Sequence, residues 1–165
     1  MLFETDEYCV DYINKEKDLE YLISIYNTNT EFLNNHTNFL EIDKMWITNE
    51  IEQMNKYNFK CCKIVSKKEN RIVGLIDFSD DELYYLSLMI IHKDYKSKGI
   101  GKSIYDAFEL YLKSLGCKNI RIDVLKNYNN KVLKFWKDRG FIEVKTIELD
   151  WSGKKLEALY MLKQI

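Results

Sequence analysis

The segment that most constrains the fold runs from residue 83 to residue 116 and joins an apolar strand to a long amphipathic helix. Residues 83–91 are apolar at nearly every position, which predicts a strand covered on both faces of its sheet. Apolar residues then recur with helical spacing. They are Ile104, Ala107, Phe108, Tyr111, Leu112 and Leu115. Gly116 stands where the glycine that ends a helix belongs. The chain therefore has to build a sheet and pack this helix against it.

The turn between this strand and helix, residues 96–103, has the composition of an anion site. Gly99 and Gly101 allow positive φ angles and leave no Cβ between the backbone amides and a ligand. Successive N–H groups and the positive end of the helix dipole attract phosphate, and lysines at 96, 98 and 102 add positive charge. The alternative is a plain connecting loop with solvated lysines. The coincidence of glycines, lysines and a helix start favours phosphate.

Two nucleotide-binding motifs come close to this turn, and each lacks one essential position. A dinucleotide fingerprint needs a third glycine three residues after Gly101, where Ile104 stands. A Walker A loop ending in Gly101-Lys102-Ser103 needs a glycine at position 96, where the chain has Lys96. A small P-loop-like nucleotide-binding protein is therefore kept only as an alternative.

The rest of the chain alternates between helical and strand periodicity in an order typical of a mixed α/β fold. Before the apolar strand we expect a strand at 8–13, helices at 15–27 and 43–57, and strands at 59–66 and 71–78. After the long helix we expect a strand at 120–125, a helix from 129 or 130 to 139, and strands at 143–151 and 155–162. A polar, asparagine-rich stretch separates the first two helices. Three consecutive strands with short turns predict an antiparallel meander.

Length, charge and cysteines narrow the class of protein. A chain of 165 residues predicts one domain over residues 1–165, and a net charge of −1 offers no bulk field for nucleic acid or a membrane. The four cysteines show no CxxC spacing, and adjacent Cys61 and Cys62 would point to opposite faces of a strand. Free thiols in the cytoplasm are therefore expected. We predict no metal site, because His36 and His92 lack further ligands nearby.

Two motifs together resemble those of the GNAT N-acetyltransferases, which move acetyl from acetyl-CoA to amines. The stretch Lys96-Ser97-Lys98-Gly99-Ile100-Gly101 is similar to their [Arg/Gln]-x-x-Gly-x-[Gly/Ala] signature. Residues 129–141 are similar to their Asn-x-x-Ala-x-x-Leu-Tyr-x-x-x-Gly-Phe pattern. The resemblance implies an acyl-CoA N-acyltransferase fold: an α/β (α+β) architecture with a mixed, mostly antiparallel central sheet of about six or seven strands, flanked by helices. It also implies a monomer or a homodimer.

The resemblance implies where acetyl-CoA binds. The pantetheine arm would lie in a V-shaped gap between the strands at 83–91 and 120–125, with a main-chain N–H near Ile91 available to the oxyanion. The residues expected to hold the cosubstrate are Met89, Ile90, Ile91, Lys96, Ser97, Lys98, Gly99, Ile100, Gly101, Lys102, Ser103 and Asn129. Capping a helix is a second role open to Asn129.

The resemblance says less about proton transfer. Asp123 matches a strand position where some family members carry a glutamate, so it is the candidate general base; a plain surface carboxylate is the alternative. Trp136 stands where the family has its general acid, a tyrosine, and indole cannot protonate a thiolate. Tyr128 or water would take that part, and Tyr128 could instead serve packing. Acidic residues 80–82 could attract a cationic acceptor or simply form a solvated turn.

The predicted activity is therefore direct transfer of acetyl from acetyl-CoA to a primary amine in a ternary complex. A non-catalytic acyl-CoA-binding sensor is the main alternative, favoured by Trp136 and by the uncertain base. The sequence does not identify the acceptor amine, because the residues that select it would lie in the first two helices and the loop between them.

Overall fold

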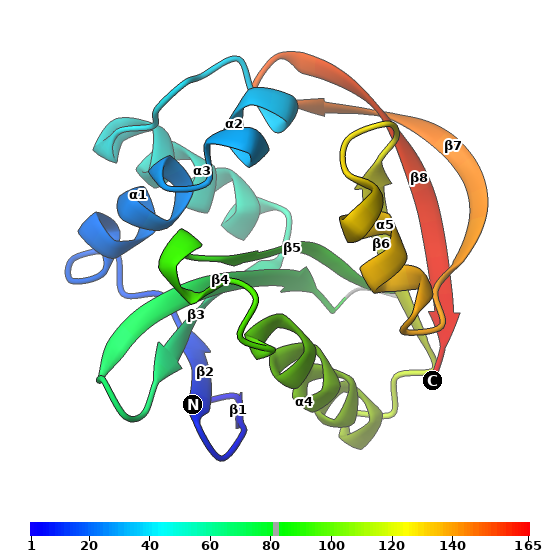
Figure 1. Ribbon diagram of the computed structural model, residues 1–165, viewed down its shortest axis with the longest axis horizontal. Helices are drawn as coiled ribbons and strands as arrows, with labels where there is room; N and C mark the ends of the chain where they lie inside the picture. Colours follow the sequence, from blue (N-terminus) through cyan, green and yellow to red (C-terminus); the bar gives the residue numbers. More distant parts are fainter. Residues whose placement is uncertain (81–82) are drawn as a thin grey trace.

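A single mixed sheet of eight strands organises the chain (Figure 1). The computed structural model describes residues 1–80 and 83–165. The strands are β1 (Phe3–Glu4), β2 (Tyr8–Tyr12), β3 (Phe59–Ser66), β4 (Arg71–Ser79), β5 (Tyr84–Ile91), β6 (Asn119–Leu125), β7 (Ile142–Trp151) and β8 (Lys154–Gln164), in the order β1-β2-β3-β4-β5-β6-β8-β7. The helices are α1 (Leu19–Asn27), α2 (Thr30–His36), α3 (Lys44–Lys56), α4 (Ile100–Ser114) and α5 (Asn130–Lys137), with a 3-10 turn η1 at Lys93–Tyr95. Every strand pair is antiparallel except β5 with β6.

Two apolar cores lie on opposite faces of this sheet. Helices α1, α2 and α3 pack on one face, and α4 and α5 contribute to the core on the other; Figure 1 shows the two groups on different sides of β3–β5. Adjacent Cys61 and Cys62 of β3 enter different cores, as their alternation predicts, and both are buried free thiols. No described helix has the length and apolar character needed to cross a membrane.

The parallel strands β5 and β6 pair over only three residues and then separate. Their register runs from Tyr84↔Ile120 to Leu86↔Ile122, while β6 goes on pairing with β8 as far as Leu125. At the same point β5 carries an extra residue relative to β4, because Asp77 is opposite Leu88 and Phe78 is opposite Leu86. Ser87 is therefore a β-bulge, and bulges bend a strand. This bend opens the expected gap beyond Leu86.

The observed elements confirm the mixed, mostly antiparallel fold and most of the expected boundaries. Asp43 caps α3 by accepting a hydrogen bond from the Trp46 N–H at 2.8 Å. Gly116 follows α4 with φ 82°. Ser152 and Gly153 form the turn of the final hairpin, and both have positive φ angles. Among expected acidic residues 80–82, Asp80 pairs with Lys60, whereas positions 81 and 82 lie outside the described residues.

Three expectations were wrong in detail. The described sheet has eight strands rather than six or seven, since the two-residue β1 escapes a period-2 search. The first helix begins at Leu19 rather than at residue 15, because Asn14 and Asp18 form a separate turn in which the Asn14 N–H donates to Asp18 at 2.7 Å. The polar stretch after it contains α2, which buries Leu33 despite its polar composition.

Candidate functional site

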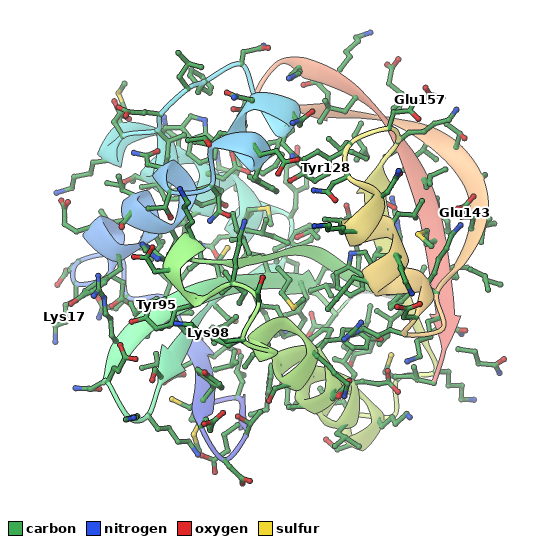
Figure 2. All side chains as sticks on the ribbon, viewed as in Figure 1. Lys17, Tyr95, Lys98, Tyr128, Glu143 and Glu157 are labelled. Carbon is green, nitrogen blue, oxygen red and sulfur yellow. The ribbon has the colours of Figure 1, made fainter. Side chains whose placement is uncertain are left out.

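A cavity of about 610 Å³ occupies the gap between β5 and β6 and extends to the start of α4. Ten of the predicted cosubstrate residues line it: Met89, Ile90, Ile91, Lys96, Ser97, Gly99, Ile100, Gly101, Lys102 and Asn129. Lys98 and Ser103 are not among its lining residues. The Lys98 ammonium lies over the Tyr95 ring, 5.1 Å from its centroid, and both residues lie on the segment between β5 and α4 (Figure 2).

The turn before α4 lies on the wall of this cavity and precedes the first hydrogen-bonded turn of the helix. Gly99 has φ 79° and Ser97 has φ 61°, and the first backbone hydrogen bond of the helix runs from Ser103 N–H to Gly99 C=O at 3.0 Å. The N–H groups of the three helical residues before Ser103 therefore have no partner within the helix. Burial lowers the pKa of the Lys96 ammonium, which lines the same wall. Amides, dipole and lysine together are groups that could hold an anion.

The main chain of β5 alternates between pairing with β4 and facing the gap. His92 N–H donates to Val73 C=O at 2.8 Å, so by antiparallel alternation Ile90 also pairs with β4. The main-chain groups of Met89 and Ile91 then face the gap. An extended ligand arm in the gap would consequently pair with these two residues rather than with Ile90.

Asn29 closes the end of the gap and was missed by sequence reasoning. Its Nδ2 donates to Ile91 C=O at 3.0 Å and to Ile25 C=O at 2.7 Å, which ties α1 to β5. Its residue is only 3% exposed, and its Oδ1 has no hydrogen-bond partner among the described residues. A buried carbonyl oxygen left unpaired at a cavity wall fits the amide N–H of a bound ligand. An N-capping asparagine gives no sequence signal for such a role.

Asp123 lies on the cavity side of β6 and is paired with Arg121. The carboxylate accepts hydrogen bonds from Arg121 Nε at 3.0 Å and Nη2 at 2.7 Å, and its side chain is 1% exposed. The guanidinium is held between the rings of Tyr85 and Tyr160, at 4.4 and 4.5 Å from their centroids. Asp123 is thus a buried, fixed carboxylate rather than a solvated one.

Tyr128 lies between α5 and α2 (Figure 2), where its ring meets His36 edge-on at 4.9 Å. Burial and the Glu31 carboxylate raise the pKa of Tyr128 to about 12, so the phenol stays protonated. Burial lowers the pKa of His36 to about 4, and its Nδ1–H donates to Phe32 C=O at 2.9 Å, so Nε2 is the acceptor nitrogen of the neutral ring. His36 stacks on Phe32 and was not expected at the site.

Trp136 and Asn129 have structural roles in the second motif. Trp136 is buried and packs edge-on against Tyr105 and Phe141, so the position that carries a phenol in the family pattern is here part of the core, although it also lines the cavity. Asn129 caps α5 by accepting the Lys131 N–H at 2.9 Å, and its Nδ2 donates to Glu31 at 3.2 Å.

A second cavity of about 230 Å³ adjoins the first on the face covered by α1–α3. Both cavities are lined by Phe32, His36, Ser87, Leu88, Asp123 and Leu125. Beyond this junction the smaller cavity reaches Asp77 and Glu50. Burial, with a smaller contribution from Glu50, raises the pKa of Asp77 to about 7, and burial also raises the pKa of Glu50.

Comparisons with known proteins agree with this arrangement. The sequence profile of the acetyltransferase (GNAT) family matches residues 19–141. No curated protein sequence matches the chain significantly. Solved structures with the same fold include an acetyltransferase from Thermus thermophilus, with TM-score 0.75 and 15% identity, covering 96% of this chain and 97% of that one.

Two further structures have narrower names. Spermidine N-acetyltransferase from Vibrio cholerae, solved with CoA and spermine, aligns with TM-score 0.73 and 12% identity over 97% of this chain and 96% of that one. Ribosomal-protein-alanine N-acetyltransferase from Brucella melitensis aligns with TM-score 0.66 and 19% identity over 95% and 99%. Identities this low establish the shared fold alone. With the family profile covering most of the chain, this protein belongs to the acetyltransferase (GNAT) family.

Proposed function

We propose that residues 1–165 act as one N-acetyltransferase domain that moves the acetyl group of acetyl-CoA to a primary amine in a ternary complex. The observation that carries this proposal is the continuity of the larger cavity, which joins the β5–β6 gap to the anion site at the start of α4. A cosubstrate with a thioester at one end and a pyrophosphate at the other requires both features in one cavity. The unpaired Asn29 Oδ1 fits the amide-bearing arm between them.

The chain's own groups divide the work along the cavity. Backbone N–H groups of residues 97–102 and the Lys96 ammonium would hold the pyrophosphate. The Met89 and Ile91 main chain would pair with the arm, and the Ile91 N–H would donate to the developing oxyanion. One such donor typically contributes about 2.7–4 kcal/mol to transition-state stabilisation.

Proton transfer is assigned to groups at the junction of the two cavities. When bound, acetyl-CoA supplies the thioester whose C–S bond breaks as the amine nitrogen bonds to its carbonyl carbon, so the amine loses one proton and the sulfur gains one. Asp123 is the proposed acceptor of the amine proton, directly or through water, and His36 Nε2 is a second acceptor at the same junction. Tyr128 O–H is the proposed donor to the sulfur, because it lines the larger cavity and carries a proton.

Calorimetry and a thiol-release assay test this proposal. The protein should bind CoA and not ATP, and it should release free thiol from acetyl-CoA only when a primary amine is present. Asp123→Asn should lower kcat by about 10²–10⁴-fold with the CoA dissociation constant little changed. Binding of ATP without CoA would identify a nucleotide-binding protein instead. Binding of CoA with no thiol release from any primary amine would identify an acyl-CoA sensor.

A further inference from the structure

The charged side chains that line the two adjoining cavities are mostly of opposite sign. The larger one is lined by three lysines and one arginine, with Asp123 as the single carboxylate on its wall among the described residues. The smaller one is lined by four carboxylates, and no lysine or arginine of the described chain is among its lining residues. Those carboxylates belong to Glu50, Asp77, Asp123 and Asp150. A polyanionic cosubstrate suits the first cavity, and the carboxylates of the second favour a cationic ligand.

Asp77 is one of the buried carboxylates of this cavity. It is 7% exposed, and its Oδ1 accepts one hydrogen bond, from Cys62 N–H at 3.3 Å. Glu50 accepts one from Trp151 Nε1 at 2.7 Å. Neither carboxylate belongs to an ion pair within residues 1–80 and 83–165. A buried carboxylate without a cation is costly, and a bound ammonium group relieves that cost.

The remaining walls suit an alkyl chain. Aromatic side chains from several elements surround the carboxylates: Tyr26, Phe32, Phe59, Tyr85 and Trp151. Trp151 closes the cavity from the end of β7, and it meets Phe32 of α2 edge-on at 5.7 Å. A cavity of about 230 Å³ equals about seven or eight times the share of one water molecule in liquid water. This is the size of a short aliphatic molecule.

We propose that the acceptor is a short aliphatic diamine, or a similar chain with an amine at one end and a second cation at the other. The reacting amine lies at the junction near Ser87 and Asp123, and the second cation lies between Asp77 and Glu50, with the alkyl chain along the aromatic walls. This inference rests on the proposed acetyltransferase function and adds the acceptor class to it.

Three amines of equal chain length test the proposal: 1,5-diaminopentane, pentylamine and 5-aminopentanoate. The thiol-release assay should give the diamine a kcat/KM about 10- to 100-fold above that of pentylamine, with the carboxylate-bearing amine the poorest substrate. Asp77→Asn and Glu50→Gln should each lower this preference, mainly through KM for the diamine. Glu148→Gln, which removes an exposed carboxylate of β7, should leave it unchanged.

The outcomes separate the two proposals. Equal kcat/KM values for diamine and pentylamine, or a preference that survives in both variants, would overturn the diamine assignment while acetyl transfer stands. Calorimetry on the CoA-loaded protein reports acceptor binding without turnover. Selective diamine binding that is lost in Asp77→Asn or Glu50→Gln, with no transfer to any amine, would support the cavity and overturn the enzymatic function. Thermal unfolding of each variant checks that the fold is retained.

Discussion

Arg121 and Asp123, two residues apart on β6, form a bidentate ion pair on the side of the sheet that faces the cavities, with N–O distances of 3.0 and 2.7 Å. The pair fixes the orientation of the proposed base, because both carboxylate oxygens are engaged. It also explains how a carboxylate with 1% side-chain exposure is tolerated at the junction of the two cavities, the proposed meeting point of acceptor amine and thioester.

Substitution of Arg121 alone should lower the free energy of unfolding far more than substitution of both Arg121 and Asp123. Arg121→Gln leaves the Asp123 carboxylate buried without its cation, which typically destabilises a protein by about 3–5 kcal/mol. The double variant Arg121→Gln, Asp123→Asn should recover a large part of that loss. Urea unfolding of the parent, the two single variants and the double variant gives a double-mutant cycle. Additive effects of the two substitutions would show that the pair is not coupled.

Lys96 and Lys98 should differ in their contribution to CoA binding. Lys96 lines the larger cavity, whereas Lys98 lies over the Tyr95 ring and is not among the lining residues. Lys96→Met should weaken CoA binding about tenfold, the loss of one charge-assisted phosphate contact, and the effect should shrink at high salt. Lys98→Met is the matched control, with little expected change. Equal losses measured by calorimetry would place both ammonium groups on the phosphates.

Tyr128→Phe should lower kcat by about 10²-fold and leave KM for acetyl-CoA nearly constant, because the proposed role of the phenol is to protonate the leaving sulfur and not to bind the cosubstrate. Tyr12→Phe, at an exposed position on β2, is the matched control for loss of a hydroxyl. Steady-state kinetics on both variants measure the difference. An unchanged kcat in Tyr128→Phe would assign protonation of the sulfur to water.

Gly74 of β4 should resist substitution because it supports the strand that borders the gap. A Cβ at this position would lie 2.7 Å from Ile90 O and 2.8 Å from Ile91 Cδ1, and the first of these is main chain. Gly74→Ala should therefore destabilise the fold by about 1–3 kcal/mol and displace β5. Gly101→Ala, whose Cβ would find nothing nearer than 3.7 Å, should be neutral or stabilising. Denaturant unfolding measures the free energies of unfolding of the two variants. Equal values would contradict the predicted clash at Gly74.

The parts of the site that depend on neighbouring residues in the chain could be predicted from the sequence. The turn at 96–103 and the helix after it are local, so glycine spacing and apolar periodicity were sufficient signals. The divergence of β5 from β6 followed only from the family resemblance, because it depends on a bulge at Ser87 that no local pattern announces. Lys98 illustrates the limit of motif reasoning, since its place in the signature does not bring it to the cavity wall.

The smaller cavity could not have been predicted. Glu50, Asp77 and Asp123 lie on α3, β4 and β6, and only the folded sheet brings them to one cavity. Asp77 interrupts the apolar run of β4 between Ile72 and Phe78, which was an available hint. Asn29 and His36 were hidden because α2 is short and polar, so the stretch that contains it was interpreted as a connection.

Asp77 should make the stability of the fold depend on pH. Its folded pKa of about 7 lies above the ordinary value of 3.8, so between pH 4 and pH 7 the unfolded chain releases a proton that the folded chain retains. Stability contributed by the protonated carboxyl is complete below pH 4 and is lost as pH rises through 7, by about 4 kcal/mol at most. Tyr26, Glu50, Cys61 and Cys62 face the same carboxyl.

The variant Asp77→Asn isolates this effect, because the asparagine oxygen can still accept the Cys62 N–H while the ionisation is removed. Urea titrations at pH 4 and pH 8 give the free energy of unfolding of the variant and of the parent. Relative to the parent, the variant should be more stable at pH 8 than at pH 4. Glu50 titrates in both proteins, so its contribution largely cancels in the difference. A pH-independent difference would mean that Asp77 is ionised in the fold. A bound diamine should reduce the pH dependence of the parent protein alone, because its second cation favours the ionised carboxylate.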